Sequence, residues 1–309
     1  MRKNKRRITS LVLSVTAAAI ILSSPMRVMA AGGRAADVSV EAPSGSVEYS
    51  LSSVSSRTLG TYAAREVYHN STSLGNIARV INGVPYIAIR AFVEGIGAAR
   101  VTYSSATKTI TLSGNGFNVS VSDGAYALYA DGRVFFASTP SVILSDGRMY
   151  VPASVLSRAL SLNLSVGSDG AVRTYGVTRP ATSGDKHYAE DAVYWLSRII
   201  SAESKGEPLI GQIAVGNVVL NRVRSADFPA TIYGVIFDRK YGVQFSPISN
   251  GTIYESPSAS SILAAKICLD GFTVSDEIMY FLRPSASTSS WIVRTRPYRF
   301  TIGNHYFFA

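Results

Sequence analysis

The spacing of apolar residues changes at residues 177–187, and the two regions on either side must therefore fold differently. Before this point, short runs such as KTITL and FNVSVS alternate apolar and polar residues, as half-buried strands do. After it, the apolar residues from Val193 to Ile200 recur at i, i+3, i+6 and i+7, which is the period of an amphipathic helix. We expect an α+β protein, with a β-rich domain containing short helices at residues 62–176 and a second domain at 188–309. The segment 177–187 contains Pro, Ser and Gly and is predicted to be a linker.

The first sixty residues have the features of an export signal followed by a leader. A basic start, RKNKRR, precedes an apolar run from Ile8 to Leu22 and a Val-Met-Ala cleavage site that ends at Ala30. The apolar run is shorter than a bilayer-spanning helix, so residues 1–30 are interpreted as a removed signal peptide. Residues 31–61 are rich in Ser, Gly, Ala and Val and are predicted to be a flexible leader. The mature protein is therefore expected to be secreted, without a membrane anchor.

The net charge gives little support to a nucleic-acid-binding function. The first thirty residues hold six of the thirty Lys and Arg residues and no Asp or Glu, so the rest of the chain carries 24 basic and 20 acidic residues, a net charge of +4. A domain that binds phosphate backbones usually has a strongly basic face. The single cysteine, Cys268, lies among apolar residues and is expected to be a buried, inert thiol.

A weak internal repeat lies within residues 62–176. The run INGVPYIAIRAFVEGIGA, from Ile81, aligns with SDGRMYVPASVLSRALSL, from Ser145, at an offset of 64. Each copy has an Asn-Gly or Asp-Gly turn pair, a short apolar strand and a helical segment. This pattern resembles the copper amine oxidase N-terminal-like domain, a stalk module of exported bacterial proteins, and implies a role in spacing or wall attachment. No metal or cofactor is expected, because the region has only His69 as a distinctive ligand.

Glu203 continues the apolar stripe of the first helix in the second domain. It lies four residues after Ile199 and three after Ile200, so it should project from the buried side of the helix end. A carboxylate placed there is costly unless it is paired or protonated, and an elevated pKa suits a general acid. The alternative is that Glu203 is solvated past the last buried turn, or paired with Lys205 or a nearby arginine.

Two further helices are expected in this domain. The run Leu209–Arg224 follows Pro208, which suits the first turn of a helix, and its Gly211 and Gly216 indicate close packing against a neighbour. Another helix is expected to open at Ser256-Pro257 and to stop at Gly271.

Separated motifs between residues 188 and 309 are similar to the SleB-type, spore-cortex-lytic family of cell-wall hydrolases. They are AESKGEP, GQIAVGNVVLNRV, FP followed by IYGVIF, QFSP, NGTIY and SWIVRTRPYRFTIGNHYF. The resemblance implies a lysozyme-like α+β fold that cleaves peptidoglycan glycan strands between N-acetylmuramic acid and N-acetylglucosamine. It assigns the catalytic acid to Glu203, the first glutamate of AExxGE. It also implies lytic transglycosylation, which needs one carboxylate and leaves 1,6-anhydromuramic ends. Glu207 is the candidate second carboxylate if the bond is instead hydrolysed.

The same motifs supply candidate substrate contacts. Besides Glu207, these are Gln244, Ser246, Asn250, Tyr254 and Tyr280, whose amide, hydroxyl and ring groups suit sugars. Trp291 is expected in the core, and His305 is expected as a hydrogen-bonded core residue. Arg283 stands where the family commonly has Asn.

Two other functions stay open on the sequence alone. One is a wall-binding protein that keeps the fold without turnover, and the other is an amidase that cleaves the stem peptide. The three histidines are widely separated, so neither a zinc amidase site nor an HExxH protease is supported. The sequence gives no oligomeric state and does not distinguish spore cortex, and hence a role in germination, from vegetative wall.

Overall fold

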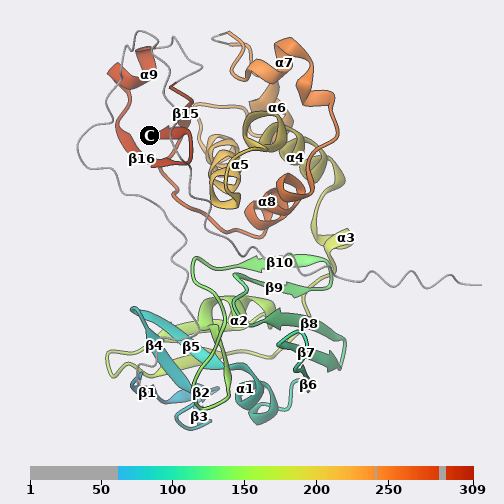
Figure 1. The fold of residues 1–309 in the computed structure, drawn as a ribbon, viewed down its shortest axis with the longest axis vertical. Coiled ribbons are helices and arrows are strands. Elements are labelled where there is room, and N and C mark those ends of the chain that lie inside the picture. The colour runs from blue at the N-terminus through green and yellow to red at the C-terminus, as the bar shows by residue number, and fades with distance from the viewer. Residues whose placement is uncertain (1–61, 241, 285–289) are drawn as a thin grey trace, which may run out of the picture. The chain divides into compact units, whose positions relative to one another are not determined.

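The structure is a computed structural model that describes residues 62–240, 242–284 and 290–309 (Figure 1). The predicted signal peptide at 1–30 and leader at 31–61 lie outside these residues. Among the residues described, no helix is both long enough and apolar enough to span a bilayer.

Three small sheets make up the region from Tyr62 to Gly176. The first has the strand order β1-β4-β5-β12-β11, the second is the meander β10-β9-β8-β7-β6, and the third has the order β13-β14-β2-β3. All pairs are antiparallel except β14 with β2. The strands are β1 (Ala64–Arg65), β2 (Val67–His69), β3 (Thr72–Ser73), β4 (Ala78–Ile81), β5 (Val84–Ala88), β6 (Arg100–Ser104), β7 (Thr109–Gly114), β8 (Phe117–Ser122), β9 (Ala127–Ala130), β10 (Arg133–Phe136), β11 (Val142–Ile143), β12 (Met149–Pro152), β13 (Asn163–Val166) and β14 (Val172–Tyr175).

The two aligned segments of this region have the same local structure. In each, a Gly-containing turn joins two antiparallel strands, and the second strand runs directly into a seven-residue helix, α1 (Ile89–Gly95) or α2 (Ala153–Ala159). The helices keep the offset of 64 residues. The strands β5 and β12 pair with each other, and Ile87 lies opposite Val151, its own equivalent at that offset. The two copies are therefore related by a local twofold axis that passes between these residues.

The segment 177–187, predicted as a linker, is packed against the β-rich region. Arg179 donates its backbone N–H to Leu160, and Gly184 donates to Asp131 at 2.7 Å. A Cβ at Gly184 would lie 2.8 Å from the carbonyl oxygen of Gly132, so the two backbones approach too closely for a larger residue. The segment ends in the short helix α3 (Gly184–His187). These contacts hold it in place, which its Pro, Ser and Gly content does not indicate.

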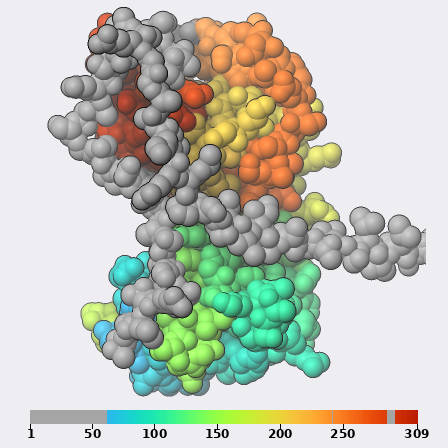
Figure 2. Space-filling view, viewed as in Figure 1, coloured from blue at the N-terminus to red at the C-terminus, as the bar shows by residue number. Residues whose placement is uncertain are grey.

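Helices and one small sheet form the region after residue 187. The sheet has the order β15-β17-β16 and is antiparallel throughout. Figure 2 shows yellow atoms of this region between the red atoms of the C-terminal strands and the orange atoms of the segment near residue 250. The elements are α4 (Glu190–Ser204), α5 (Leu209–Arg224), α6 (Ile232–Phe237), α7 (Ser246–Asn250), the 3₁₀ helix η1 (Thr252–Tyr254), α8 (Ala259–Leu269), β15 (Tyr280–Leu282), α9 (Ser290–Thr295), β16 (Tyr298–Ile302) and β17 (His305–Phe308). The expected α+β class, β-rich first and helical second, is confirmed.

The observed helix ends follow their capping groups. The bounds of α5 agree with the predicted run, beginning immediately after Pro208. The helix α8 begins two residues later than expected from Ser256-Pro257, because the hydroxyl of Ser258 accepts a hydrogen bond from the backbone N–H of Ser261 at 3.1 Å. Such an N-cap satisfies one of the free N–H groups at a helix start.

Strand β10 contributes to two hydrophobic cores because its residues alternate between two faces. Phe135 is buried in the core of the β-rich region, whereas Val134 and Phe136 are buried among the helices. The ring of Phe136 lies edge-on to Phe272, with centroids 4.8 Å apart. One strand therefore supplies apolar surface to both cores, as its two-residue period allows.

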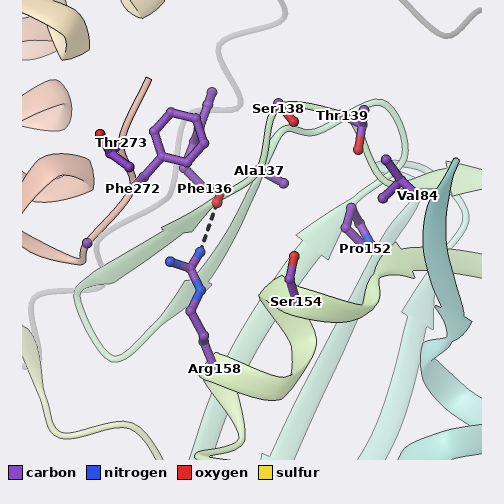
Figure 3. A pocket seen from close by; sticks show the side chains of 11 residues that line it. Val84, Phe136, Ala137, Ser138, Thr139, Pro152, Ser154, Arg158, Phe272 and Thr273 are labelled. Carbon is purple, nitrogen blue, oxygen red and sulfur yellow. Dashed lines mark hydrogen bonds between the residues drawn. The ribbon is translucent and has the colours of Figure 1, made fainter. Parts of the chain in front are cut away.

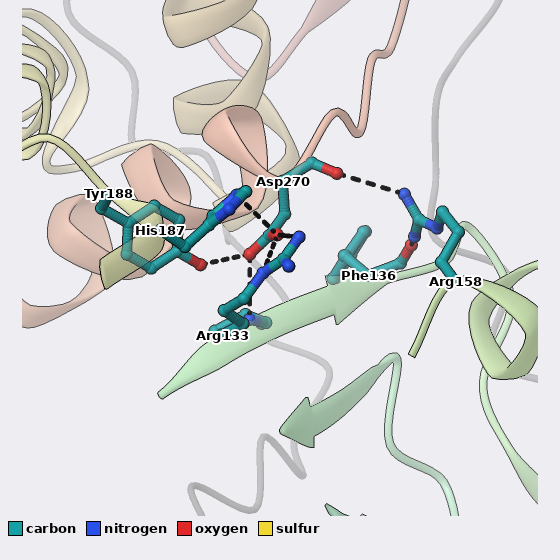
Figure 4. A network of polar contacts seen from close by, with 7 residues as sticks. Arg133, Phe136, Arg158, His187, Tyr188 and Asp270 are labelled. Atoms are coloured by element: carbon teal, nitrogen blue, oxygen red, sulfur yellow. Dashed lines mark hydrogen bonds and ion pairs between the residues drawn. The ribbon is translucent and has the colours of Figure 1, made fainter. Parts of the chain in front are cut away.

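Asp270, at the C-terminal end of α8, accepts hydrogen bonds from β10 and from the residue after α3 (Figure 4). The guanidinium of Arg133 donates through both Nε, at 2.7 Å, and Nη2, and the backbone N–H of Val134 donates at 3.2 Å. The hydroxyl of Tyr188 donates to the same carboxylate, and His187 Nε2 lies 3.5 Å away. The Asp270 side chain is almost fully buried, so these donors replace the water that it loses on folding.

Candidate active site

Glu203 lies in the last turn of α4, on the side of the helix that carries the core residues. Ile199 and Ile200, one turn earlier, are fully buried, and the side chain of Glu203 is partly buried beyond them. The predicted stripe therefore continues to the carboxylate.

The electrostatic surroundings of Glu203 favour its protonated form. Burial raises its pKa to about 7, and no cation among the residues that the structure describes offsets that effect. Glu203 has neither an ion pair nor a hydrogen bond through its side chain to any residue that the structure describes. Lys205, the alternative partner, instead lies 3.9 Å from the carboxylate of Glu255. A carboxyl group in this state can donate a proton near neutral pH.

Glu207 is held by the protein itself. Its Oε2 accepts from the backbone N–H of Asn304 and its Oε1 from the Asn304 side-chain amide, both at 2.9 Å. A Cβ at Gly303 would lie 1.9 Å from Glu207 Oε2, so the β16–β17 turn reaches the carboxylate only because that position is glycine. This geometry fixes the hairpin to the start of α5. The substrate contact that the sequence predicted for Glu207 stays a prediction.

Buried polar contacts fix the chain between α4 and α5. Gln212 donates from Nε2 to the carbonyl oxygen of Glu207 at 3.0 Å, and its Oε1 accepts from the Ser261 hydroxyl at 2.8 Å. The short connection after Glu203 is thus tied both to α8 and to the C-terminal hairpin.

The glycines of α5 allow the close packing that the sequence indicated. A Cβ at Gly216 would lie 2.7 Å from Cys268 Sγ and 2.9 Å from Ile200 Cδ1, and one at Gly211 would lie 3.3 Å from Ile302. Cys268 is buried, and burial raises the pKa of its thiol well above the usual range. It is therefore a packing residue at the contact between α5 and α8.

The predicted contact residues between 244 and 250 have exposed or half-exposed side chains with local partners. Gln244 donates to the carbonyl oxygen of Gly242 at 3.2 Å. Ser246 is exposed at the start of α7. Asn250 accepts from both the backbone N–H and the hydroxyl of Thr252, at 3.0 and 2.8 Å. The latter contacts order the turn between α7 and η1.

The two predicted tyrosines lie in different clusters of rings. Tyr254 is 62 % exposed, and its ring centroid lies 6.4 Å from that of Trp195 on α4. The ring centroid of Tyr280, on β15, lies 5.8 Å from that of Trp291. The guanidinium carbon of Arg296 lies over the Tyr280 ring, 4.6 Å from its centroid. The prediction that Trp291 lies in the core is wrong, because its side chain is 45 % exposed on the short helix α9.

Arg222 is a buried cation that the sequence patterns did not single out. Its guanidinium lies 5.0 to 5.3 Å from the rings of Phe228, Phe245 and Tyr280, and its Nε donates to the carbonyl oxygen of Met279 at 2.8 Å. Burial lowers its pKa to about 10. Arg222 thus packs beneath both the QFSP segment and β15, two segments that the family resemblance associates with substrate. An arginine close to the last apolar residues of a long helix was the available signal.

His305 is buried, as expected, but its expected hydrogen bond is not present at Nδ1. That atom has no partner among the residues described, and the ring lies edge-on to Phe281 at 5.3 Å. Burial lowers the pKa of His305, so the ring is neutral near pH 7. Arg283 is exposed.

A separate cavity of about 290 Å³ lies away from Glu203 (Figure 3). Its walls include Phe136, Phe272, Ser154 and Arg158. Arg158 already donates to the carbonyl oxygen of Phe136 at 2.9 Å, so its cation is engaged within the protein. Over the described parts of the chain, no cluster of His, Cys, Asp and Glu could hold a metal ion.

Family models match both regions of the chain. Residues 206–308 match the model of the cell wall hydrolase family, and residues 69–175 match that of the copper amine oxidase N-terminal domain. Glu203 lies just before the first of these matches.

Curated relatives are similar to the C-terminal region. A spore cortex-lytic enzyme of Bacillus cereus is 37 % identical over 120 residues, which are 39 % of this chain and 45 % of the relative. One from Oceanobacillus iheyensis is 34 % identical over 128 residues, 41 % of this chain and 45 % of the relative. The chain therefore matches less than half the length of these relatives. The solved catalytic domain of the germination-specific lytic transglycosylase SleB from Bacillus anthracis is 34 % identical, with all of that domain and 42 % of this chain covered and a TM-score of 0.36.

Proposed function

Because residues 206–308 belong to the cell wall hydrolase family, we propose that this protein cleaves the glycan strands of peptidoglycan as a lytic transglycosylase. The observation that carries the proposal is the state of Glu203, a partly buried carboxyl group whose pKa is raised to about 7 and which has no ion pair among the described residues. The names of the relatives, spore cortex-lytic enzymes and a lytic transglycosylase, support the same reaction class.

One carboxyl group suffices for this reaction. Glu203 protonates the glycosidic oxygen as the bond from that oxygen to C1 of N-acetylmuramic acid breaks, and N-acetylglucosamine leaves with the proton. The 6-hydroxyl of the muramic acid then attacks C1 and gives its proton to the Glu203 carboxylate. The acid is regenerated, no water is consumed, and the product has a 1,6-anhydro end.

The position of Glu207 favours this route over hydrolysis. Ordinary glycosidases use two carboxyl groups, one of which acts on water or on the sugar itself. Each oxygen of Glu207 already accepts a hydrogen bond from Asn304, which supports a structural role for the second glutamate of the motif.

The substrate and location follow from the same proposal. Peptidoglycan is the expected partner, so the protein would act in the cell wall or spore cortex after secretion, and a cortex substrate would place it in germination. The region matched to the copper amine oxidase N-terminal domain would act as the stalk.

Muropeptide analysis tests the proposed function. Purified cortex and vegetative sacculi are digested separately with the protein, with the Glu203→Gln variant, and with Glu190→Gln as a control at an exposed glutamate at the start of the same helix. Mass spectrometry is expected to show anhydromuramic ends with the protein and the control, and none with Glu203→Gln.

Each other result selects a different function. Reducing muramic ends would indicate a hydrolase, free amino groups without new saccharide ends an amidase, and binding without any release a wall-binding protein. Full lysis by Glu203→Gln would remove Glu203 as the acid.

A further inference from the structure

Five aromatic side chains from three helices form a continuous surface cluster beside α4, which we call the aromatic patch. Trp195 is its centre, with ring centroids 4.9 Å from Tyr194, 5.3 Å from Tyr233, 5.1 Å from Phe237 and 6.4 Å from Tyr254. Tyr233 and Phe237 stack on each other at 4.4 Å. Trp195 and Phe237 also pack against the core of the helical region, so the patch has a rigid base.

The tyrosines of the patch are more exposed than packing requires. Tyr194, Tyr233 and Tyr254 are 42 %, 52 % and 62 % exposed. Within the parts of the chain that are described, none of their hydroxyls makes a hydrogen bond. Clustered exposed rings usually mark a binding surface. Rings with free hydroxyls suit a ligand that has both apolar faces and polar groups.

The rings differ in which faces are open. The guanidinium of Arg198 lies 3.6 Å from the centroid of the Tyr194 ring and covers one face of it. Tyr233 has Phe237 on one face, and its exposure leaves the other side open. Tyr254, the most exposed, has only an edge contact with Trp195. Tyr233 and Tyr254 therefore offer the surface that a planar ligand can reach.

The helix α4 carries both Glu203 and Trp195, the centre of the patch. Trp195 precedes Glu203 by eight residues, which corresponds to about 12 Å along a helix and about 80° around its axis. The segment that follows Tyr254 stays close to this helix end, since Ser258 donates its backbone N–H to the Ser201 hydroxyl at 3.1 Å. A chain bound at Glu203 and extended along α4 by about the length of a disaccharide would reach the patch.

We propose that the aromatic patch is a distal subsite for the peptidoglycan glycan strand, with Tyr233 and Tyr254 stacking on sugar rings several units from the cleaved bond. The C–H groups on a sugar face carry partial positive charge and pack well on the negative face of an aromatic ring. Hydroxyls of the same sugars can bond to the free tyrosine hydroxyls. The inference rests on the proposed function, because the strand is the expected substrate at Glu203.

Strand binding tests the inference directly. Affinity is measured by calorimetry for peptide-free glycan strands, long and tetrasaccharide, in the Glu203→Gln background, where turnover does not interfere. The variants are Tyr233→Ala and Tyr254→Ala, alone and together. Tyr103→Ala is the matched control, since Tyr103 is 46 % exposed on β6, outside the patch.

Each single variant is expected to weaken binding of long strands about 3- to 10-fold. The double variant should weaken binding of long strands at least about 10-fold and binding of the tetrasaccharide much less. Tyr103→Ala should leave the affinity for long strands unchanged. Unchanged affinity for long strands in a double variant that keeps its melting temperature would overturn the subsite and leave the proposed function standing. An equal loss for both ligands would also overturn it. Failure of the proposed function would be seen in a different experiment, the muropeptide analysis, as lysis by the Glu203→Gln variant.

Discussion

Both carboxylate oxygens of Glu207 accept hydrogen bonds from Asn304, one from its backbone N–H and one from its side-chain amide. The pair joins the start of α5 to the turn between β16 and β17. A glutamate that the motif places close to Glu203 thus belongs to the framework of the site.

Replacing Glu207 with Gln should destabilise the protein. The amide NH₂ would face one of the two Asn304 donors, so a partly buried donor loses its acceptor, and we expect a loss of about 1–2 kcal/mol in the free energy of unfolding. Urea denaturation measures this, with Glu190→Gln as an exposed control. If Glu207→Gln instead kept its stability and lost lysis, Glu207 would have a direct chemical role.

The rate of strand cleavage should fall as the pH rises through about 7. Burial raises the pKa of Glu203 to about 7, and only the protonated form can act as the acid. Initial rates on peptide-free strands should be highest below that pH and should decline about tenfold per pH unit well above it. A rate that stays constant between about pH 6 and about pH 9 would contradict a general acid with this pKa.

Glu203→Gln should be more stable than the unmodified protein at alkaline pH. The pKa of Glu203 is higher in the folded protein, about 7, than its ordinary value of 4.5, so folding favours the protonated form. As the pH rises from the lower to the higher of these two pKa values, ionisation of Glu203 therefore lowers the free energy of unfolding progressively, by at most about 3 kcal/mol. Melting temperatures of the two proteins should agree at about pH 4 and diverge up to about pH 8. A constant difference across this range would show that Glu203 is not buried as described.

Sequence patterns predicted the parts of this site that depend on local periodicity. The run Leu209–Arg224 is the observed α5, the repeat at an offset of 64 appears as two matching strand–helix units, and Glu203 continues the buried stripe of α4. In each case the signal lies within one element or in two copies of it.

Contacts between residues far apart in the chain could not be predicted in this way. Glu207 and Asn304 are 97 residues apart, and nothing in either segment indicates the pairing. Trp195 meets Tyr233 and Tyr254 only because three helices pack together. Trp291 was misplaced because a single tryptophan carries no periodicity, and its short helix leaves the ring at the surface.

Gly216→Ala should destabilise the helical region by overpacking. The added methyl group would lie 2.7 Å from Cys268 Sγ and 2.9 Å from Ile200 Cδ1, so α5 must move away from its neighbours at a cost of about 1–3 kcal/mol. Gly206→Ala is the control, because a Cβ there has no neighbour within 4 Å. Equal unfolding free energies for the two variants would show that α5 has room to move at Gly216.

Asp270→Asn should weaken the network at the end of α8 without changing the size of the side chain. The amide cannot replace the charge that faces Arg133, and its NH₂ group meets donors from Val134 and Tyr188. Breaking a buried pair in this way leaves a cation without its partner, and the expected loss is about 3 kcal/mol. Asp169→Asn is the comparison, since Asp169 pairs with Arg173 at the exposed surface and should matter much less. Equal losses in urea denaturation for the two variants would mean that the Asp270 carboxylate is no more important to stability than a surface ion pair.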